Sequence, residues 1–147
     1  MYQRILVPTD SSSLSKKAVQ HATALAQTCG AEIVVLNVVP RYPVSYLEGA
    51  VVFETQDVAR IEKQWSEQAR ELVDKAVAQV QAKGVKARAA VVKSDLVAES
   101  IISAARKHKA DLIVMASHGR KGIKRLLLGS ETQHVLTHST LPVLVLR

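Results

Sequence analysis

The apolar positions of the chain follow two spacings that alternate along its length. Short continuous runs rich in Val, Ile and Leu are separated by longer segments in which apolar residues recur every three or four positions. Continuous apolar runs are typical of parallel strands covered on both faces, whereas the longer spacing is typical of amphipathic helices. The runs predict strands at 4–10, 32–39, 85–92, 111–115 and 142–147.

Two of the amphipathic segments end at a glycine. One runs from about 14 to 29 and is followed by Gly30, and the other runs from about 57 to 83 and is followed by Gly84. Glycine takes the left-handed conformation that closes a helix more readily than any other residue. We therefore predict that a helix ends before each of these glycines.

Two further helices are predicted from their capping residues. Asp95 precedes a third periodic segment and is a candidate N-cap, and Ser130 with Gln133 matches a capping box. Strands and helices then alternate, and right-handed crossovers between parallel strands predict an α/β fold, a doubly wound three-layer α/β/α sandwich. Because no break in composition divides the chain, we expect a single domain over 1–147.

Residues 40–56 do not fit this alternation. They hold two prolines, a glycine, two tyrosines and the only Phe of the chain. Connections of this length without regular structure are usually functional or disordered. A lid over a site and a contact for an unknown protein partner are both open.

The composition narrows the classes of function. The net charge is +7, but one Trp, three Tyr and one Phe offer few platforms for stacked bases, so nucleic acid is disfavoured as a partner. No apolar run approaches about 18 residues, which disfavours a membrane span. Cys29 has no partner for a disulfide and is expected to pack on a helix face, which fits the cytoplasm.

The arrangement of strands predicts where a ligand would bind. In an open α/β sheet, ligands bind beyond the carboxyl ends of the strands, where the winding reverses. With the strand order 3-2-1-4-5, this place lies between the end of the first strand at Pro8, Thr9 and Asp10 and the end of the fourth strand. The stretch after the fourth strand, 116–130, combines glycines, cations and a Gly-Ser pair, a composition that suits an anion.

Several residues of this stretch, and Asp10 opposite them, have the chemistry to contact an anion or its sugar. Gly119 can take a positive φ and let backbone amides approach the anion. Gly129 and Ser130 open a helix whose unpaired amides and dipole attract phosphate, while Asp10 opposite them could accept from a ribose hydroxyl or help hold a metal ion. Counter-charge would come from Arg120, Lys121, Lys124 and Arg125. The same cations also fit a solvated surface, and the residues alone leave both interpretations open.

The common nucleotide motifs are absent, but a family pattern is present. No GxxxxGK[ST] occurs and no GxGxxG follows the first strand, which disfavours a P-loop and a Rossmann dinucleotide site. Instead ILVPTD, ADLIVMASHG, LPVLVLR and the spacing Gly119-x9-Gly129-Ser130 resemble the universal stress protein family over essentially the whole chain. The resemblance implies a Rossmann-like, adenine nucleotide alpha hydrolase-like fold. Its nucleotide-binding subset carries Gly-x2-Gly-x9-Gly-Ser/Thr, and Ala116 replaces the first glycine here.

The resemblance also implies a ligand and its contacts. ATP would bind, with Mg²⁺ or Mn²⁺ bridging its phosphates; adenine would lie against Val38, with Met115 at its border and Asp10 near the ribose or the base. Glu131 suits the helix dipole, but it would repel phosphate unless it points away or helps hold the metal ion. The residues expected around the nucleotide are Pro8, Thr9, Asp10, Val38, Met115, Ala116, Gly119, Arg120, Gly129, Ser130, Glu131 and Thr132.

The last strand is expected to form an interface. The resemblance to the universal stress protein family implies a homodimer formed through this strand, 142–147. An exposed apolar edge strand is an association liability unless it is paired, so the physical expectation is the same.

No catalytic residue is assigned from the sequence. His118 could serve as a base or could simply bond to nearby backbone. His134 and His138 have the i, i+4 spacing of a metal pair but no evident third ligand, and the serines between 11 and 15 are interpreted as helix and turn caps.

Three hypotheses about function follow. The first is an ATP-binding universal stress protein, a small dimeric regulatory protein of the stress response with slow or no hydrolysis. The second is a metal-dependent ATPase or phosphotransferase that uses the same cleft. The third is a nucleotide-free interaction module or a weak binder of nucleic acid.

Overall fold

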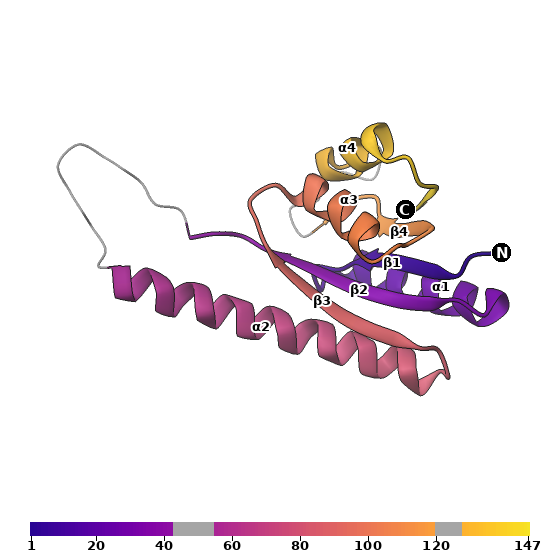
Figure 1. Ribbon diagram of the computed structural model, residues 1–147, viewed down its shortest axis with the longest axis horizontal. Coiled ribbons are helices and arrows are strands. Elements are labelled where there is room, and N and C mark those ends of the chain that lie inside the picture. The colour runs from indigo at the N-terminus through magenta and orange to yellow at the C-terminus, as the bar shows by residue number, and fades with distance from the viewer. Residues whose placement is uncertain (43–54, 120–127) are drawn as a thin grey trace.

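A five-stranded parallel sheet forms the centre of the protein. The computed structural model describes residues 1–42, 55–119 and 128–147 (Figure 1). The strands are β1 (Arg4–Pro8), β2 (Glu32–Val39), β3 (Ala87–Lys93), β4 (Leu112–Ala116) and β5 (Val143–Leu146). Their order in the sheet is β3-β2-β1-β4-β5, and every neighbouring pair is parallel, which confirms the predicted order 3-2-1-4-5.

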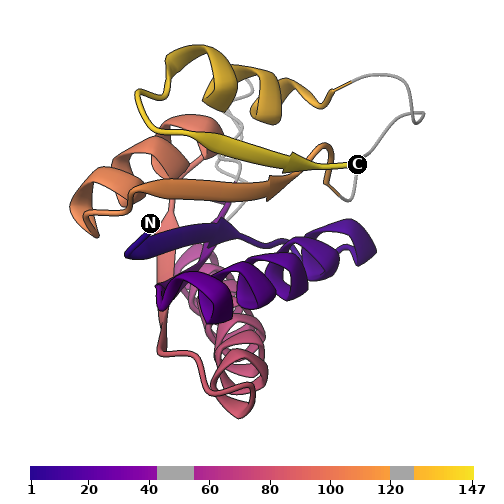
Figure 2. The same cartoon turned by 90° about the vertical axis from the view of Figure 1, so that its right-hand side faces the viewer.

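Two helices cover each face of the sheet (Figure 2). Helices α1 (Ser13–Cys29) and α2 (Thr55–Ala82) pack on one face, and α3 (Val97–Lys107) and α4 (Ser130–His138) pack on the other. The predicted three-layer sandwich is therefore confirmed. No helix of the described residues is long and apolar enough to cross a membrane.

The continuous apolar runs arise because both faces of the inner strands are buried. Ile5 and Val7 of β1 belong to the core under α1 and α2, whereas Leu6 between them belongs to the core under α3 and α4. All three side chains are fully buried. Adjacent residues of a strand point to opposite faces, so a strand covered on both faces needs apolar residues at every position.

The helix ends predicted from local signals are found as expected. Gly30 has a φ of 71° and closes α1 with a hydrogen bond from its amide to the carbonyl of Ala26. Gly84, with a φ of 80°, follows the end of α2. Among the serines before α1, Ser12 is the N-cap, and its side chain accepts from the amide of Ser15.

Two predicted caps are wrong. The N-cap of α3 is Leu96, not Asp95, whose carboxylate instead accepts from the amide of Arg41 at 2.9 Å. The N-cap of α4 is Gly129, so Ser130 is the first helical residue and forms no capping box. Neither cap residue can accept from the first helical amides with its side chain, because Leu96 is apolar and Gly129 has no side chain.

Most of the segment 40–56 lies outside the described residues. Its role as a lid or as a partner contact therefore stays a prediction. Of its tyrosines, Tyr42 stacks on Trp65 of α2, with ring centroids 5.8 Å apart. The backbone amide of Tyr42 also donates to Glu62 at 3.1 Å, so the start of the segment is fixed against α2.

Candidate functional site

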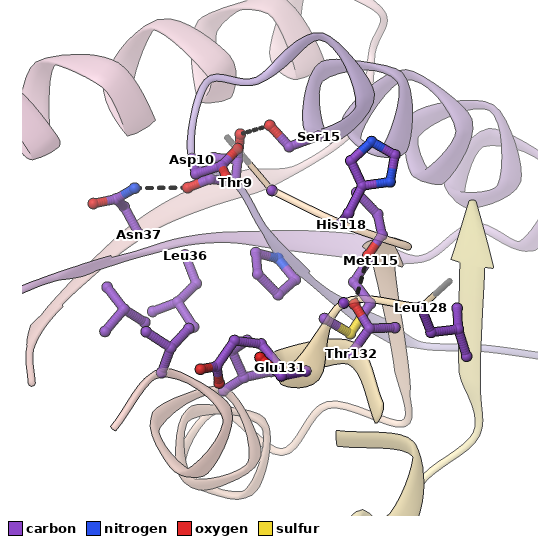
Figure 3. Close-up of a pocket in the computed structure, with 18 residues that line it drawn as sticks. Thr9, Asp10, Ser15, Leu36, Asn37, Met115, His118, Leu128, Glu131 and Thr132 are labelled. Atoms are coloured by element: carbon purple, nitrogen blue, oxygen red, sulfur yellow. Dashed lines mark hydrogen bonds between the residues drawn. The ribbon is translucent and has the colours of Figure 1, made fainter. Parts of the chain in front are cut away.

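A cavity of about 700 Å³ opens at the carboxyl ends of β1, β2 and β4 (Figure 3). It lies where β1 pairs with β2 on one side and with β4 on the other, which is the reversal point predicted from the sequence. Every described member of the predicted nucleotide-binding set lines it, namely Pro8, Thr9, Asp10, Val38, Met115, Ala116, Gly119, Gly129, Ser130, Glu131 and Thr132. Arg120 and the cations Lys121, Lys124 and Arg125 lie outside the described residues.

One side of the cavity is apolar and belongs to the core. Leu36 is fully buried, Ile101 of α3 is 2% exposed and Met115 is 5% exposed. Val38 and Val97 extend this surface toward the opening. Because these side chains are held by the sheet and by α3, the apolar wall is preformed and has a defined shape.

The turn between β1 and α1 forms a polar rim. The carboxylate of Asp10 accepts from the amide of Ser12 at 2.9 Å, and the hydroxyls of Thr9 and Ser15 are 3.0 Å apart. Between them Ser11 adopts a φ of 65°, a left-handed conformation that costs free energy in a residue other than glycine. The hydrogen bonds of the turn hold this conformation and thereby fix the position of Asp10.

Asn37 supports this turn from the neighbouring strand and is absent from the predicted set. Its side-chain amide donates to the carbonyl of Thr9 at 2.6 Å (Figure 3). The acceptor is a carbonyl, so the nitrogen of Asn37 must face it. A polar residue in the otherwise apolar run 33–39 was the available signal in the sequence.

The need for glycine at position 119 differs from the prediction. Gly119 is not among the described residues with positive φ. A Cβ atom built on it would instead overlap the carboxylate of Asp10. The backbone passes directly beside Asp10, so any larger residue at position 119 would push the Asp10 carboxylate away from its place at the rim.

Gly129 is also a position of close packing. Its amide donates to the carbonyl of Ser117 at 2.7 Å, and a Cβ atom would lie 3.1 Å from that carbonyl oxygen and 3.4 Å from the Cα of His118. The start of α4 is therefore drawn against the end of β4 by backbone contacts. Ala116, which replaces the first motif glycine, lies in β4 opposite Leu146 and is not among the residues with positive φ, so its methyl group causes no backbone strain.

The first turn of α4 is tied to two other elements. The carboxylate of Glu131 accepts from the amide of Ala98 at 2.8 Å and so caps α3, which its own N-cap residue does not do. Thr132 is 2% exposed, and its hydroxyl donates to the carbonyl of Ala116 at 2.9 Å. Glu131 is thus held toward α3 by a hydrogen bond, and the hydroxyl of Thr132 is engaged with the protein.

The histidines singled out from the sequence have local partners. His118 lies on the cavity wall with its Nδ1 3.1 Å from the hydroxyl of Ser117. The rings of His134 and His138 stack with centroids 4.1 Å apart, and His134 Nε2 is 3.4 Å from Glu99. Within residues 1–42, 55–119 and 128–147, no three His, Cys, Asp or Glu residues are placed to hold a metal ion.

Fold and site together define a doubly wound α/β protein with a ligand cavity at the point where its strand order reverses. The chain belongs to the universal stress protein family, whose family model matches residues 1–147. Universal stress protein MJ0531 of Methanocaldococcus jannaschii is 33% identical over 147 residues, which cover 100% of this chain and 83% of that protein.

Solved structures share the fold. The structure of protein MJ0577 superposes with a TM-score of 0.84 at 28% identity and covers 99% of this chain and 96% of its own. A universal stress protein from Archaeoglobus fulgidus, solved in complex with dAMP, superposes with a TM-score of 0.65 at 20% identity, covering 99% and 98% of the two chains. At that identity the second likeness concerns the fold alone.

Proposed function

We propose that this universal stress protein binds ATP as a regulatory ligand, with slow or no hydrolysis, as a single domain over 1–147 in the cytoplasm. The observation that carries the proposal is the cavity at the strand reversal, with an apolar wall on one side and the first turn of α4 on the other. An adenine nucleotide has the same division into an apolar base and a charged phosphate chain.

The base end of the cavity suits adenine and ribose. Val38, Ile101 and Met115 offer an apolar surface for a purine ring. Asp10 lies beside this surface, where a carboxylate oxygen can accept from a ribose hydroxyl. The fold is compatible with such a ligand, because the Archaeoglobus fulgidus protein was solved with dAMP.

The opposite end of the cavity suits phosphate. Gly129 caps α4 without a side chain of its own, and Gly129, Ser130 and Thr132 at the start of α4 line the cavity. Helix N-termini of this kind attract phosphate oxygens through unpaired amides and the helix dipole. Glu131, whose charge would oppose phosphate, is held by the amide of Ala98. Mg²⁺ or Mn²⁺ would bind together with the nucleotide. Of the two carboxylates that line the cavity, Asp10 would be the ligand for the metal ion, because Glu131 is hydrogen-bonded to Ala98.

A homodimer through 142–147 is part of the proposal. The strand β5 is the last in the sheet and pairs with β4, and all of its side chains are only half-buried. An apolar edge of this kind is normally covered by another chain. Bound nucleotide would then act on the dimer or on its affinity for a partner protein.

Titration calorimetry with ATP and Mg²⁺ tests the binding. We expect saturable binding of ATP below about 1 mM, and a three- to tenfold loss of affinity in Ser130→Ala, because one hydrogen-bond donor contributes about 0.5–1.5 kcal/mol. Ser103→Ala on the exposed face of α3 is the matched control and should bind like the wild type. Gly129→Val is a poor test, since a Cβ atom already crowds Ser117.

Two results would end this proposal. One is the absence of any binding up to millimolar ATP. The other is metal-dependent turnover that disappears on replacement of Asp10, which would favour the ATPase alternative. Mass spectrometry of the native protein identifies directly the small molecule that copurifies with it.

Replacing Asn37 tests how the rim is held. Asn37→Leu keeps the volume of the side chain but leaves the carbonyl of Thr9 without its donor, so we expect a loss of about 1–3 kcal/mol in the free energy of unfolding. ATP affinity should fall as well, because Asp10 follows Thr9. Urea unfolding and calorimetry measure the two effects.

The control for Asn37 is another side-chain amide that donates to a backbone carbonyl. Gln27 donates to the carbonyl of Lys83 at 2.9 Å on an exposed surface, away from the cavity. Gln27→Leu should leave ATP affinity unchanged. Equal effects of the two substitutions on ATP would exclude a role for Asn37 in positioning the rim.

A further inference from the structure

One side of the edge strand β3 is not covered by any other element of the described residues. It is the outermost strand of the sheet and pairs only with β2 within the described residues. Helix α2 runs along one face of β3 (Figure 1), whereas α3 on the other face packs on β1 and β2. On the outer edge of β3 the carbonyl of Ala87 accepts from the side chain of Gln81 at 3.2 Å, and no other strand of the described residues pairs with this edge. The rest of the edge can therefore pair with another chain.

A groove of about 560 Å³ follows this uncovered side between β3 and α3. Ala90 and Val92 of β3 face the α3 side of the sheet, and Ser100 and Ser103 of α3 form the opposite wall. These side chains are small, so they leave room for a third element. Leu96 lines the groove as well and is 61% exposed, the largest apolar exposure in the described chain after Met1.

The groove is positively charged. Arg70 of α2 and Lys107 of α3 line it, and Arg88 lies on the same side of β3 as Ala90. Partial burial lowers the pKa of His108 in the groove wall, and the nearby charges of Arg88, Lys107 and Arg4 lower it further. The acidic residue of the groove, Glu99, is 3.4 Å from His134 on the side of α4.

The charge decides what can occupy the groove. A second copy of β3 would bring Arg88 and its neighbours against the same cations, which disfavours pairing between two copies. Cations on an edge strand commonly serve to prevent such self-association. That role alone does not account for the small side chains of the groove or for the exposed Leu96, which offer room and apolar surface to a partner. The cations around them favour a partner of negative charge.

We propose that this groove binds an extended acidic peptide segment of a partner protein, which adds to the sheet as a strand beside β3. Main-chain hydrogen bonds to the edge of β3 would supply affinity, as in other cases of strand addition. On the face of the peptide toward α3, small apolar side chains would pack on Ala90 and Val92, and a carboxylate on the same face would meet Lys107 and Arg88. A carboxylate on the opposite face would meet Arg70 of α2. The proposal is independent of nucleotide binding.

Fluorescence anisotropy with a designed probe tests it. The probe is a fluorescein-labelled heptapeptide with two Asp at each end and three Val between them, so that each face of the added strand carries both residue types. A peptide with Lys in place of Asp is its control. We expect saturable binding of the acidic probe alone. Lys107→Glu should weaken binding at least fivefold, whereas Lys17→Glu, an equal change of charge on the exposed surface of α1, should not.

His108 gives a readout confined to the groove. An anionic peptide beside it adds negative charge, so the pKa of His108 measured by NMR should rise when the acidic probe is bound. The proposal is overturned if the probe does not saturate, if Lys17→Glu weakens it as much as Lys107→Glu, or if the pKa of His108 does not move. If a single-stranded RNA oligonucleotide binds and is weakened by Lys107→Glu, while the acidic peptide does not bind, the groove is assigned to nucleic acid instead.

Discussion

Replacing Gly119 with alanine is expected to reduce ATP affinity by about ten- to a hundredfold. The new Cβ atom would occupy the position of the Asp10 carboxylate and displace it from the rim of the cavity. A hydrogen bond to a charged group contributes about 1.5–3 kcal/mol, which corresponds to this range of affinity. Calorimetry with ATP measures the change, and circular dichroism establishes that the variant is folded.

Double-mutant comparison makes the cause of this loss specific. If Gly119→Ala acts by displacing Asp10, adding it to Asp10→Ala should cost little more than Asp10→Ala alone. Ser103→Ala, on the exposed face of α3 and outside the cavity lining, is the control and should bind ATP like the wild type. Full additivity of the first two substitutions would contradict the role assigned to Gly119, and so would wild-type affinity in Gly119→Ala.

Leu36→Ala is expected to lower the free energy of unfolding by about 2–5 kcal/mol and to weaken ATP binding as well. Leu36 is fully buried in the core under α3 and α4, and the same side chain forms part of the cavity wall. Truncating it removes buried apolar area and leaves a void that the surrounding strands can fill only in part. Urea unfolding measures the stability, and calorimetry measures the affinity.

Leu6 provides the control for this prediction. It is also fully buried in the same core, but it does not line the cavity. Leu6→Ala should therefore lose a similar amount of stability and keep the affinity of the wild type for ATP. A loss below about 1 kcal/mol in Leu36→Ala would contradict a well-packed wall, and equal effects on ATP would contradict a direct contact.

Much of the fold could be predicted because its signals are local or repeat along the chain. The central residues of β1 and β2 are buried on both faces, which makes 5–7 and 33–36 continuously apolar. Gly30 and Gly84 mark helix ends by their own conformation. The position of the cavity follows from the strand order. Parallel strands joined by right-handed crossovers leave few alternatives to that order.

The features that escaped prediction depend on residues far apart in the sequence. Asp95 had the right residue type for a cap, but α3 receives its hydrogen bond from Glu131, which is 33 positions beyond Ala98. Gly119 lies against the carboxylate of Asp10, which follows another strand. Asn37 donates to the carbonyl of Thr9, 28 positions earlier. The spacing of residues along the chain and their helix or strand propensities do not predict these contacts, because the contacts form only when the sheet is assembled.

The bond between Glu131 and Ala98 has a consequence for the order of assembly. During synthesis α3 leaves the ribosome well before residue 131, so the opening turn of α3 remains without its carboxylate partner until α4 has docked. We therefore expect the amide of Ala98 to exchange its hydrogen with solvent when α4 detaches. The last helix of the chain thereby completes the hydrogen bonding of a helix synthesised before it. Because residues of both helices line the cavity, we expect the cavity to reach its final shape only when α4 has docked.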